Sequence, residues 1–173
     1  VSYIMKNIQM VDQVNRILYA RISSDAERGT FLINTSGELI GWVMKPEEDR
    51  ENEEITMAMG ISDYKGILEN LTNGLAAPCF GIEGQEVPDI MISQGLPQGI
   101  YVLNSVTDRP AYNAGIQNGD IITHVDGRKI TTMKDFQNTI DGLECGRSIH
   151  VMVQRNGRDQ YAELEFQVTV GAR

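Results

Sequence analysis

The second half of the chain carries a series of short motifs, most of which contain glycine. The series opens with Cys79-Phe80-Gly81-Ile82 and continues through Gly99-Ile100-Tyr101-Val102, residues 109–116, residues 118–122, Val125-Asp126-Gly127 and the stretch 132–140. Glycine adopts the positive φ angles that tight turns need, so such motifs predict turns beside short strands or helices. One such motif means little, but the whole series in this order predicts a single β-rich module between residues 78 and 170.

Local signals inside this module predict its elements. Pro110 begins a short helix that Gly115 ends. Asp120 is predicted to hold the turn that leads into the next strand. Asn156-Gly157 is a favoured two-residue hairpin turn and is predicted to join the last two strands. The predicted strands are residues 121–125, 149–154 and 162–168, with a further hairpin turn at Asp126-Gly127.

The segment Cys79-Phe80-Gly81-Ile82, here called the candidate carboxylate loop, has the properties that a receptor for a chain terminus needs. A carboxylate leaving water needs several backbone N–H donors that converge on one point. Gly81 lets the backbone turn so that successive N–H groups can do this. Ile82 begins a strand beside which a peptide could add as a further strand.

A helix over residues 132–140 is predicted to lie against this strand. Thr131 or Thr132 can cap the helix, and Asp135 lies in its first turn. Within the helix, Met133, Phe136 and Ile140 are spaced so that they share one face. This face is therefore predicted to pack against the module, either as core or as the lining of a binding pocket.

Residues 1–77 read as short strands followed by one helix. Strands are predicted at residues 2–11, 17–22, 30–34, 39–44 and 55–59, with a turn at 35–38. Ser62 is predicted to cap a helix that ends at Gly74, with an apolar face that packs on the strands. The fold class is mainly β with a few helices (β-rich α+β), with a domain boundary placed before Pro78.

The motifs of residues 78–173 resemble the PDZ domains of the HtrA/DegP family of trypsin-like serine proteases. The resemblance implies that Cys79, Phe80, Gly81 and Ile82 form the carboxylate-binding loop, although the first position is usually aromatic and here is Cys79. It also implies that the side chains on the helix face, together with Ile82, line an apolar pocket for the last side chain of the ligand. Such a pocket favours Val, Leu, Ile or Phe. Of the three helix residues Met133, Phe136 and Ile140, the sequence favours Met133 for the pocket, and Phe136 and Ile140 could equally be core.

Residues 1–77 resemble the second barrel of the protease domain in the same family, together with its trailing helix. Ser24-Asp25-Ala26 and residues 29–41 match the region around the nucleophile, and the nucleophilic serine falls on Arg28. Arginine has no nucleophilic oxygen and stays protonated. The sequence of the loop that would supply the oxyanion hole also differs from the family pattern, and only Gly29 matches it. We therefore expect Arg28 to be a degenerate nucleophile position.

The other members of a catalytic triad are also missing from this sequence. His124 and His150 are the only histidines, and both lie in strands of the PDZ-like part. The first barrel, which carries the histidine and aspartate in the family, has no counterpart in this chain. We predict no catalytic residues here.

Composition excludes several other classes of function. The net charge of −9 disfavours nucleic acid and anionic membranes as partners, and no run of about 18 apolar residues is present. The acidic stretch 47–54 is predicted to be a solvated loop. Cys79 and Cys145 are the only cysteines and are predicted to remain as thiols. There is no histidine–carboxylate cluster at metal-binding spacing and no glycine-rich phosphate loop, so we predict no metal and no cofactor.

These features predict a non-catalytic module that captures peptide C-termini or exposed apolar strands by β-strand addition. Two alternatives remain: a fragment of an active HtrA-like serine endopeptidase in extracytoplasmic protein quality control, or a PDZ module that drives homo-oligomeric assembly. The resemblance further implies an extracytoplasmic protein, often anchored by one membrane helix. The chain begins with Val1 and shows no signal peptide, so we expect it to be part of a longer protein.

Overall fold

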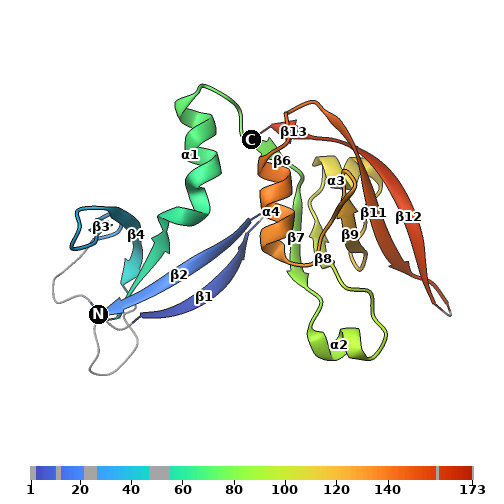
Figure 1. The fold of residues 1–173 in the computed structure, drawn as a ribbon, viewed down its shortest axis with the longest axis horizontal. Coiled ribbons are helices and arrows are strands. Elements are labelled where there is room, and N and C mark those ends of the chain that lie inside the picture. Colours follow the sequence, from blue (N-terminus) through green and yellow to red (C-terminus); the bar gives the residue numbers. More distant parts are fainter. Residues whose placement is uncertain (1–2, 11–12, 22–26, 47–54, 159, 173) are drawn as a thin grey trace. The chain divides into compact units, whose positions relative to one another are not determined.

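The computed structural model describes residues 3–10, 13–21, 27–46, 55–158 and 160–172 (Figure 1). The chain divides into two compact units. The first includes Val14–Glu69 and the second includes Asn70–Arg173. The strand-rich architecture confirms the predicted β-rich α+β class. The segment Ser24-Asp25-Ala26, which matches the family's nucleophile region, and the acidic stretch 47–54 lie outside the described residues.

The first unit contains one antiparallel sheet among its described residues. Its strand order is β1-β2-β5-β4-β3, and Val43, Ala58 and Met59 are buried. Gly41 of β4 pairs with Gly60 of β5. A Cβ at Gly41 would overlap the Met59 carbonyl oxygen, so position 41 requires a glycine. The strands are β1 (Tyr3–Met10), β2 (Gln13–Arg21), β3 (Phe31–Ile33), β4 (Leu39–Pro46) and β5 (Ile55–Gly60).

The helix that follows β5 begins differently from the prediction. A 3-10 turn, η1 (Ile61–Tyr64), precedes α1 (Lys65–Thr72), and its N-cap is Gly60, whose backbone is extended and which offers no capping side chain. The predicted cap at Ser62 is therefore wrong. The Tyr64 ring lies 4.9 Å from the Trp42 ring. Leu71 lies on the apolar face that the sequence predicts for this helix, and it is 61% exposed.

The second unit is built on an antiparallel sheet whose described strands have the order β12-β11-β9-β8-β7, with β10 paired to β9. A separate short pairing joins β6 to β13. Figure 1 shows α4 lying alongside β6 and β7, against which it packs. The elements are β6 (Pro78–Cys79), β7 (Ile82–Glu86), α2 (Asp89–Ser93), β8 (Ile100–Ser105), α3 (Pro110–Ala114), β9 (Ile121–Val125), β10 (Arg128–Lys129), α4 (Met133–Asp141), β11 (Ser148–Asn156), β12 (Tyr161–Thr169) and β13 (Gly171–Ala172).

Most of the predicted turns of the second unit are confirmed. Pro110 is at the start of α3, and Gly115 ends the helix with a φ of 98°. Asp126 and Gly127 both have positive φ between β9 and β10. The predicted two-residue turn at Asn156-Gly157 is wrong, because Asn156 is still part of β11 and pairs with Tyr161 of β12. The helix α2 was not predicted.

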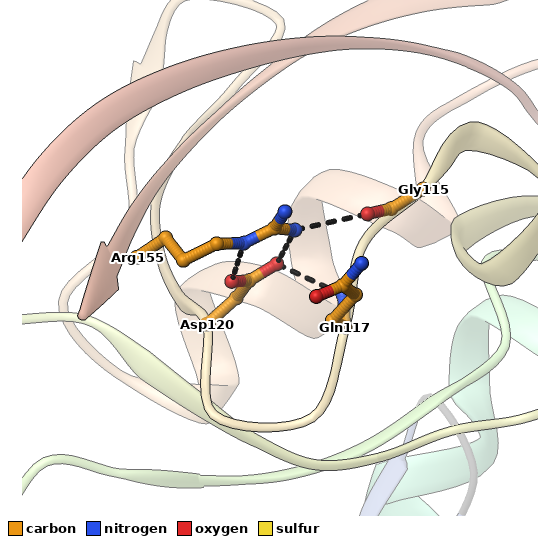
Figure 2. A network of polar contacts seen from close by, with 4 residues as sticks. All are labelled: Gly115, Gln117, Asp120 and Arg155. Carbon is orange, nitrogen blue, oxygen red and sulfur yellow. Dashed lines mark hydrogen bonds and ion pairs between the residues drawn. The ribbon is translucent and has the colours of Figure 1, made fainter. Parts of the chain in front are cut away.

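Asp120 holds its turn through a network that also reaches β11 (Figure 2). Its carboxylate is 1% exposed and accepts a hydrogen bond from the backbone N–H of Gln117 at 2.9 Å. Arg155 donates to both oxygens, from Nε at 2.7 Å and from Nη2 at 2.8 Å, and Nη2 also donates to the Gly115 carbonyl at 2.9 Å. These hydrogen bonds to Asp120 raise the pKa of Arg155. The predicted role of Asp120 in the turn is confirmed, and its partner Arg155 was not foreseen.

The start of α4 is a complete capping box. The Thr132 hydroxyl accepts from the Asp135 N–H at 3.1 Å, and the Asp135 carboxylate accepts from the Thr132 N–H at 3.0 Å. Side-chain hydrogen bonds, first from Thr131 and then from Thr132, lower the pKa of Asp135, while burial opposes the shift. The predicted cap is therefore confirmed.

This box makes the stability of the second unit depend on pH. A carboxyl whose pKa is lowered in the folded state stabilises it above the unfolded value of about 3.9, and this contribution disappears as pH falls through the folded pKa. We expect Asp135→Ala to lower the free energy of unfolding at pH 7 by about 1 kcal/mol, because the hydrogen bonds from Thr131 and Thr132 to its carboxylate are lost. The difference from the wild type should shrink below pH 4 in urea titrations. An equal difference at pH 7 and pH 3 would contradict the assignment.

Candidate peptide-binding site

The candidate carboxylate loop links two strands that are fixed on either side of it. At the start of the loop, Cys79 pairs with Gly171 of β13. At its end, Ile82 pairs with Ser105 of β8. Phe80 and Gly81 form the connection, so the backbone of these two residues is held from both ends.

The loop's carbonyl groups are held by the segment between β8 and α3. The Phe80 oxygen accepts from the Ala111 N–H at 2.9 Å, and the Gly81 oxygen accepts from the Val106 N–H at 3.0 Å. In a trans peptide the C=O group and the following N–H point in opposite directions. The N–H groups of Gly81 and Ile82 are therefore both directed away from residues 106–111. Two successive donors with this orientation can contribute to a nest for a carboxylate.

Gly81 is required at its position for two independent reasons. Its φ is 94°, a left-handed conformation that L side chains rarely adopt. A Cβ at this position would also overlap the Cβ of Arg109. The prediction that Gly81 turns the backbone is confirmed, and the close approach of Arg109 is an additional constraint.

α4 lies beside both strands that flank the loop. At the loop end, the Phe136 ring contacts the Phe80 ring edge to face, with centroids 5.5 Å apart. At the far end of β7, the Met133 N–H donates to Glu86 Oε1 at 2.8 Å. Phe136 is therefore near the loop, whereas Met133, the residue favoured from the sequence, lies toward the opposite end of β7.

The predicted site side chains are all buried. None is more than 5% exposed: Cys79, Phe80, Ile82, Met133, Phe136 and Ile140. Burial alone fits both a hydrophobic core and the lining of a pocket. Their role in binding the last side chain of a ligand therefore stays a prediction.

Sequence reasoning missed two charged residues at the site, Glu86 and Arg109. Arg109 lies against Gly81 and directs its guanidinium Nη1 to within 3.7 Å of the Cys79 thiol. The only signal for Arg109 was its place before Pro110, which indicates a helix start and no contact with the loop. Beside it is a pocket of about 370 Å³, lined by Cys79, Asp108, Arg109, Pro110, Asn113, Ala114, Gln167, Thr169, Gly171 and Ala172.

Arg28, which the sequence predicts to be a degenerate nucleophile position, lies in the other unit. Arg28 is exposed, in a turn closed by a hydrogen bond from the Thr30 N–H to the Glu27 oxygen at 3.0 Å. The two histidines have other partners. His150 Nδ1 lies 2.9 Å from Glu165 Oε1, and His124 Nδ1 lies 3.1 Å from Thr123 Oγ1.

Two kinds of feature are absent from the described part of the chain. No group of three His, Cys, Asp or Glu residues there could hold a metal ion. No helix there is long and apolar enough to cross a membrane.

The chain matches the PDZ domain family over residues 40–166. It is 27% identical over 145 residues to the serine protease Do-like HtrA of Lactobacillus helveticus, covering 76% of this chain and 35% of the relative. It is also 27% identical over 159 residues to a probable periplasmic serine endoprotease DegP-like of Rhizobium meliloti (strain 1021), covering 86% of this chain and 31% of the relative. The chain therefore spans about a third of the length of these curated relatives.

Comparison with solved structures gives the same fold. The structure described as HtrA-type protease AlgW with decapeptide has a TM-score of 0.60 at 21% sequence identity, and covers 91% of this chain and 50% of that one. The chain belongs to the PDZ domain family, and its homologues are HtrA/DegP-type serine proteases.

Proposed function

We propose that this chain is a peptide-binding module that captures C-termini by strand addition beside β7. The observation that carries the proposal is the orientation of the Phe80 and Gly81 carbonyls toward residues 106–111. This orientation turns two successive N–H groups the other way, as a carboxylate receptor requires. Membership of the PDZ domain family supports the same function.

The side chain at the end of the ligand is proposed to enter an apolar pocket at the loop end of α4. Phe136 lies there against Phe80, and we place Ile82 and Ile140 in the same wall. Met133 would contact a position further upstream in the ligand, because its N–H meets Glu86 at the far end of β7. The proposed ligands are peptides that end in Val, Leu, Ile or Phe.

The test is fluorescence anisotropy of this chain with labelled peptides that differ only in the last residue. Peptides ending in Val, Leu or Phe should bind, and the same peptides ending in Asp or Lys should bind at least tenfold more weakly, because a buried charge lacks partners in an apolar pocket. Equal binding of all five would contradict the apolar pocket.

We also propose that the chain itself is non-catalytic. Arg28 occupies the nucleophile position, and the only histidines, His124 and His150, lie on β9 and β11. A serine without a base is a poor nucleophile. We therefore expect Arg28→Ser to hydrolyse a fluorogenic casein no faster than the wild-type chain does. Cleavage that a serine-directed inhibitor blocks would contradict the proposal.

We further propose an extracytoplasmic location, since relatives are named periplasmic endoproteases. Anchoring of the whole protein to a membrane by a helix outside this sequence is a proposal that rests on the family resemblance.

A further inference from the structure

Glu86 connects the two elements that flank the proposed groove. It is the last residue of β7, and its Oε1 accepts a hydrogen bond from the Met133 N–H at 2.8 Å. Met133 is the first residue of α4 after the cap Thr132. The N–H groups at the start of a helix carry partial positive charge, which favours a carboxylate at this place. Glu86 is thereby held at the end of the groove that is remote from Gly81.

The Glu86 carboxylate keeps capacity for a further partner. The side chain belongs to an exposed residue, and a carboxylate offers about four acceptor sites, of which the Met133 N–H uses one. Among the described residues no cation lies within ion-pair distance of it. Lys134 follows Met133 on α4 and is exposed, without an ion pair to Glu86. In the described part of the chain, the Glu86 carboxylate therefore has the Met133 N–H as a hydrogen-bond partner and no ion-pair partner.

The strand geometry sets which part of a ligand meets this charge. Ile82–Glu86 spans about 13 Å at a rise of about 3.3 Å per residue. A ligand that runs antiparallel to β7, with its last residue beside Ile82, brings a residue about four positions upstream opposite Glu86. Side chains alternate along a strand, so the third and fifth positions from the ligand's end point to the same side as the last one.

We propose that Glu86 is a specificity-determining residue that selects peptides carrying Lys or Arg upstream of the apolar C-terminal residue. This inference rests on the proposed function, because it assumes that a peptide binds beside β7. The ligand class that follows is a peptide with an apolar end and a basic residue at the third or fifth position from that end.

The test uses the whole chain and three apolar-ended peptides with Lys, Gln or Glu at both upstream positions. At low ionic strength the Lys peptide should bind about fivefold more tightly than the Gln peptide, and the Glu peptide more weakly still. Glu86→Gln keeps an oxygen for the Met133 N–H and removes the charge, so it should bring the three affinities together and leave the Gln peptide unchanged. Glu144→Gln makes the same change in net charge at an exposed position outside the groove, and should preserve the preference.

The possible outcomes distinguish a failure of the proposed role of Glu86 from a failure of the proposed peptide-binding function. If the Gln peptide binds and the wild type shows no preference for Lys over Glu, the role of Glu86 is wrong and the peptide-binding function stands. The role of Glu86 is equally wrong if Glu144→Gln removes the preference as fully as Glu86→Gln does, since the effect is then one of net charge. If none of the three peptides binds, the proposed function fails and the inference fails with it.

Discussion

Gly81→Ala is expected to abolish peptide binding. An alanine at φ 94° is strained by about 1–2 kcal/mol, and its Cβ would overlap the Arg109 Cβ, which cannot rotate away because it is attached directly to the backbone. Overpacking of this kind costs about 1–3 kcal/mol. The loop must shift to accommodate the methyl group, and the N–H groups of Gly81 and Ile82 then lose their common direction. We expect the affinity for an apolar-ended peptide to fall at least 100-fold in anisotropy titrations, in line with about 3 kcal/mol.

Gly95→Ala is the matched control for this change. Gly95 has a φ of 96°, close to that of Gly81, and no atom beyond its two chain neighbours lies within 4 Å of the position that its Cβ would take. Both variants therefore introduce the same strain, and only one introduces the overlap at the loop. Gly95→Ala should bind peptide as the wild type does. Unchanged affinity in Gly81→Ala, with a normal circular dichroism spectrum, would contradict the assignment of the carboxylate loop.

Arg155→Met is expected to produce the largest loss of stability. It leaves the Asp120 carboxylate, 1% exposed, without the two hydrogen bonds that Arg155 donates. Removing one partner of a buried ion pair costs about 3–5 kcal/mol, because an uncompensated charge remains buried. The cation–π contact of Arg155 with Phe166, at 5.3 Å, is lost as well. We expect the free energy of unfolding from urea titrations to fall by about 3 kcal/mol or more.

A second variant tests whether the unpaired Asp120 carboxylate causes the loss of stability in Arg155→Met. In the double variant Asp120→Asn/Arg155→Met the buried group is neutral, and its amide oxygen can still accept from the Gln117 N–H. It should recover at least about 1 kcal/mol relative to Arg155→Met alone. A loss below about 1 kcal/mol in the single variant, or no recovery in the double, would show that the network contributes little.

The elements that the sequence predicted well are those determined by short-range chemistry. Thr132 and Asp135 cap α4 through bonds that span three residues, and Gly115 and Asp126-Gly127 adopt the positive φ values that their motifs require. The two-residue turn predicted at Asn156-Gly157 does not form, because the pairing of β11 with β12 extends to Asn156 and Tyr161. There the pairing of two long strands decides the loop, and the local turn preference does not.

The site was predictable in its backbone and not in its charged side chains. The conformation of Gly81 follows from its own sequence motif. The contact between Glu86 and Met133 joins positions 47 residues apart, and that between Arg109 and Cys79 joins positions 30 apart. No local pattern encodes such pairs, because they exist only once β7, α3 and α4 have packed around the loop. The same packing places Phe136, and not Met133, beside Phe80.

If the chain binds the free carboxylate at the end of a peptide, blocking that carboxylate must weaken binding. The test is anisotropy with one labelled peptide ending in Val, prepared with a free and with an amidated C-terminus. Amidation removes the charge that the N–H groups of Gly81 and Ile82 would stabilise, and a hydrogen bond to a charged group is worth about 1.5–3 kcal/mol. We predict that the free peptide binds and that amidation weakens binding at least tenfold. Equal affinity for the two forms would contradict the claim.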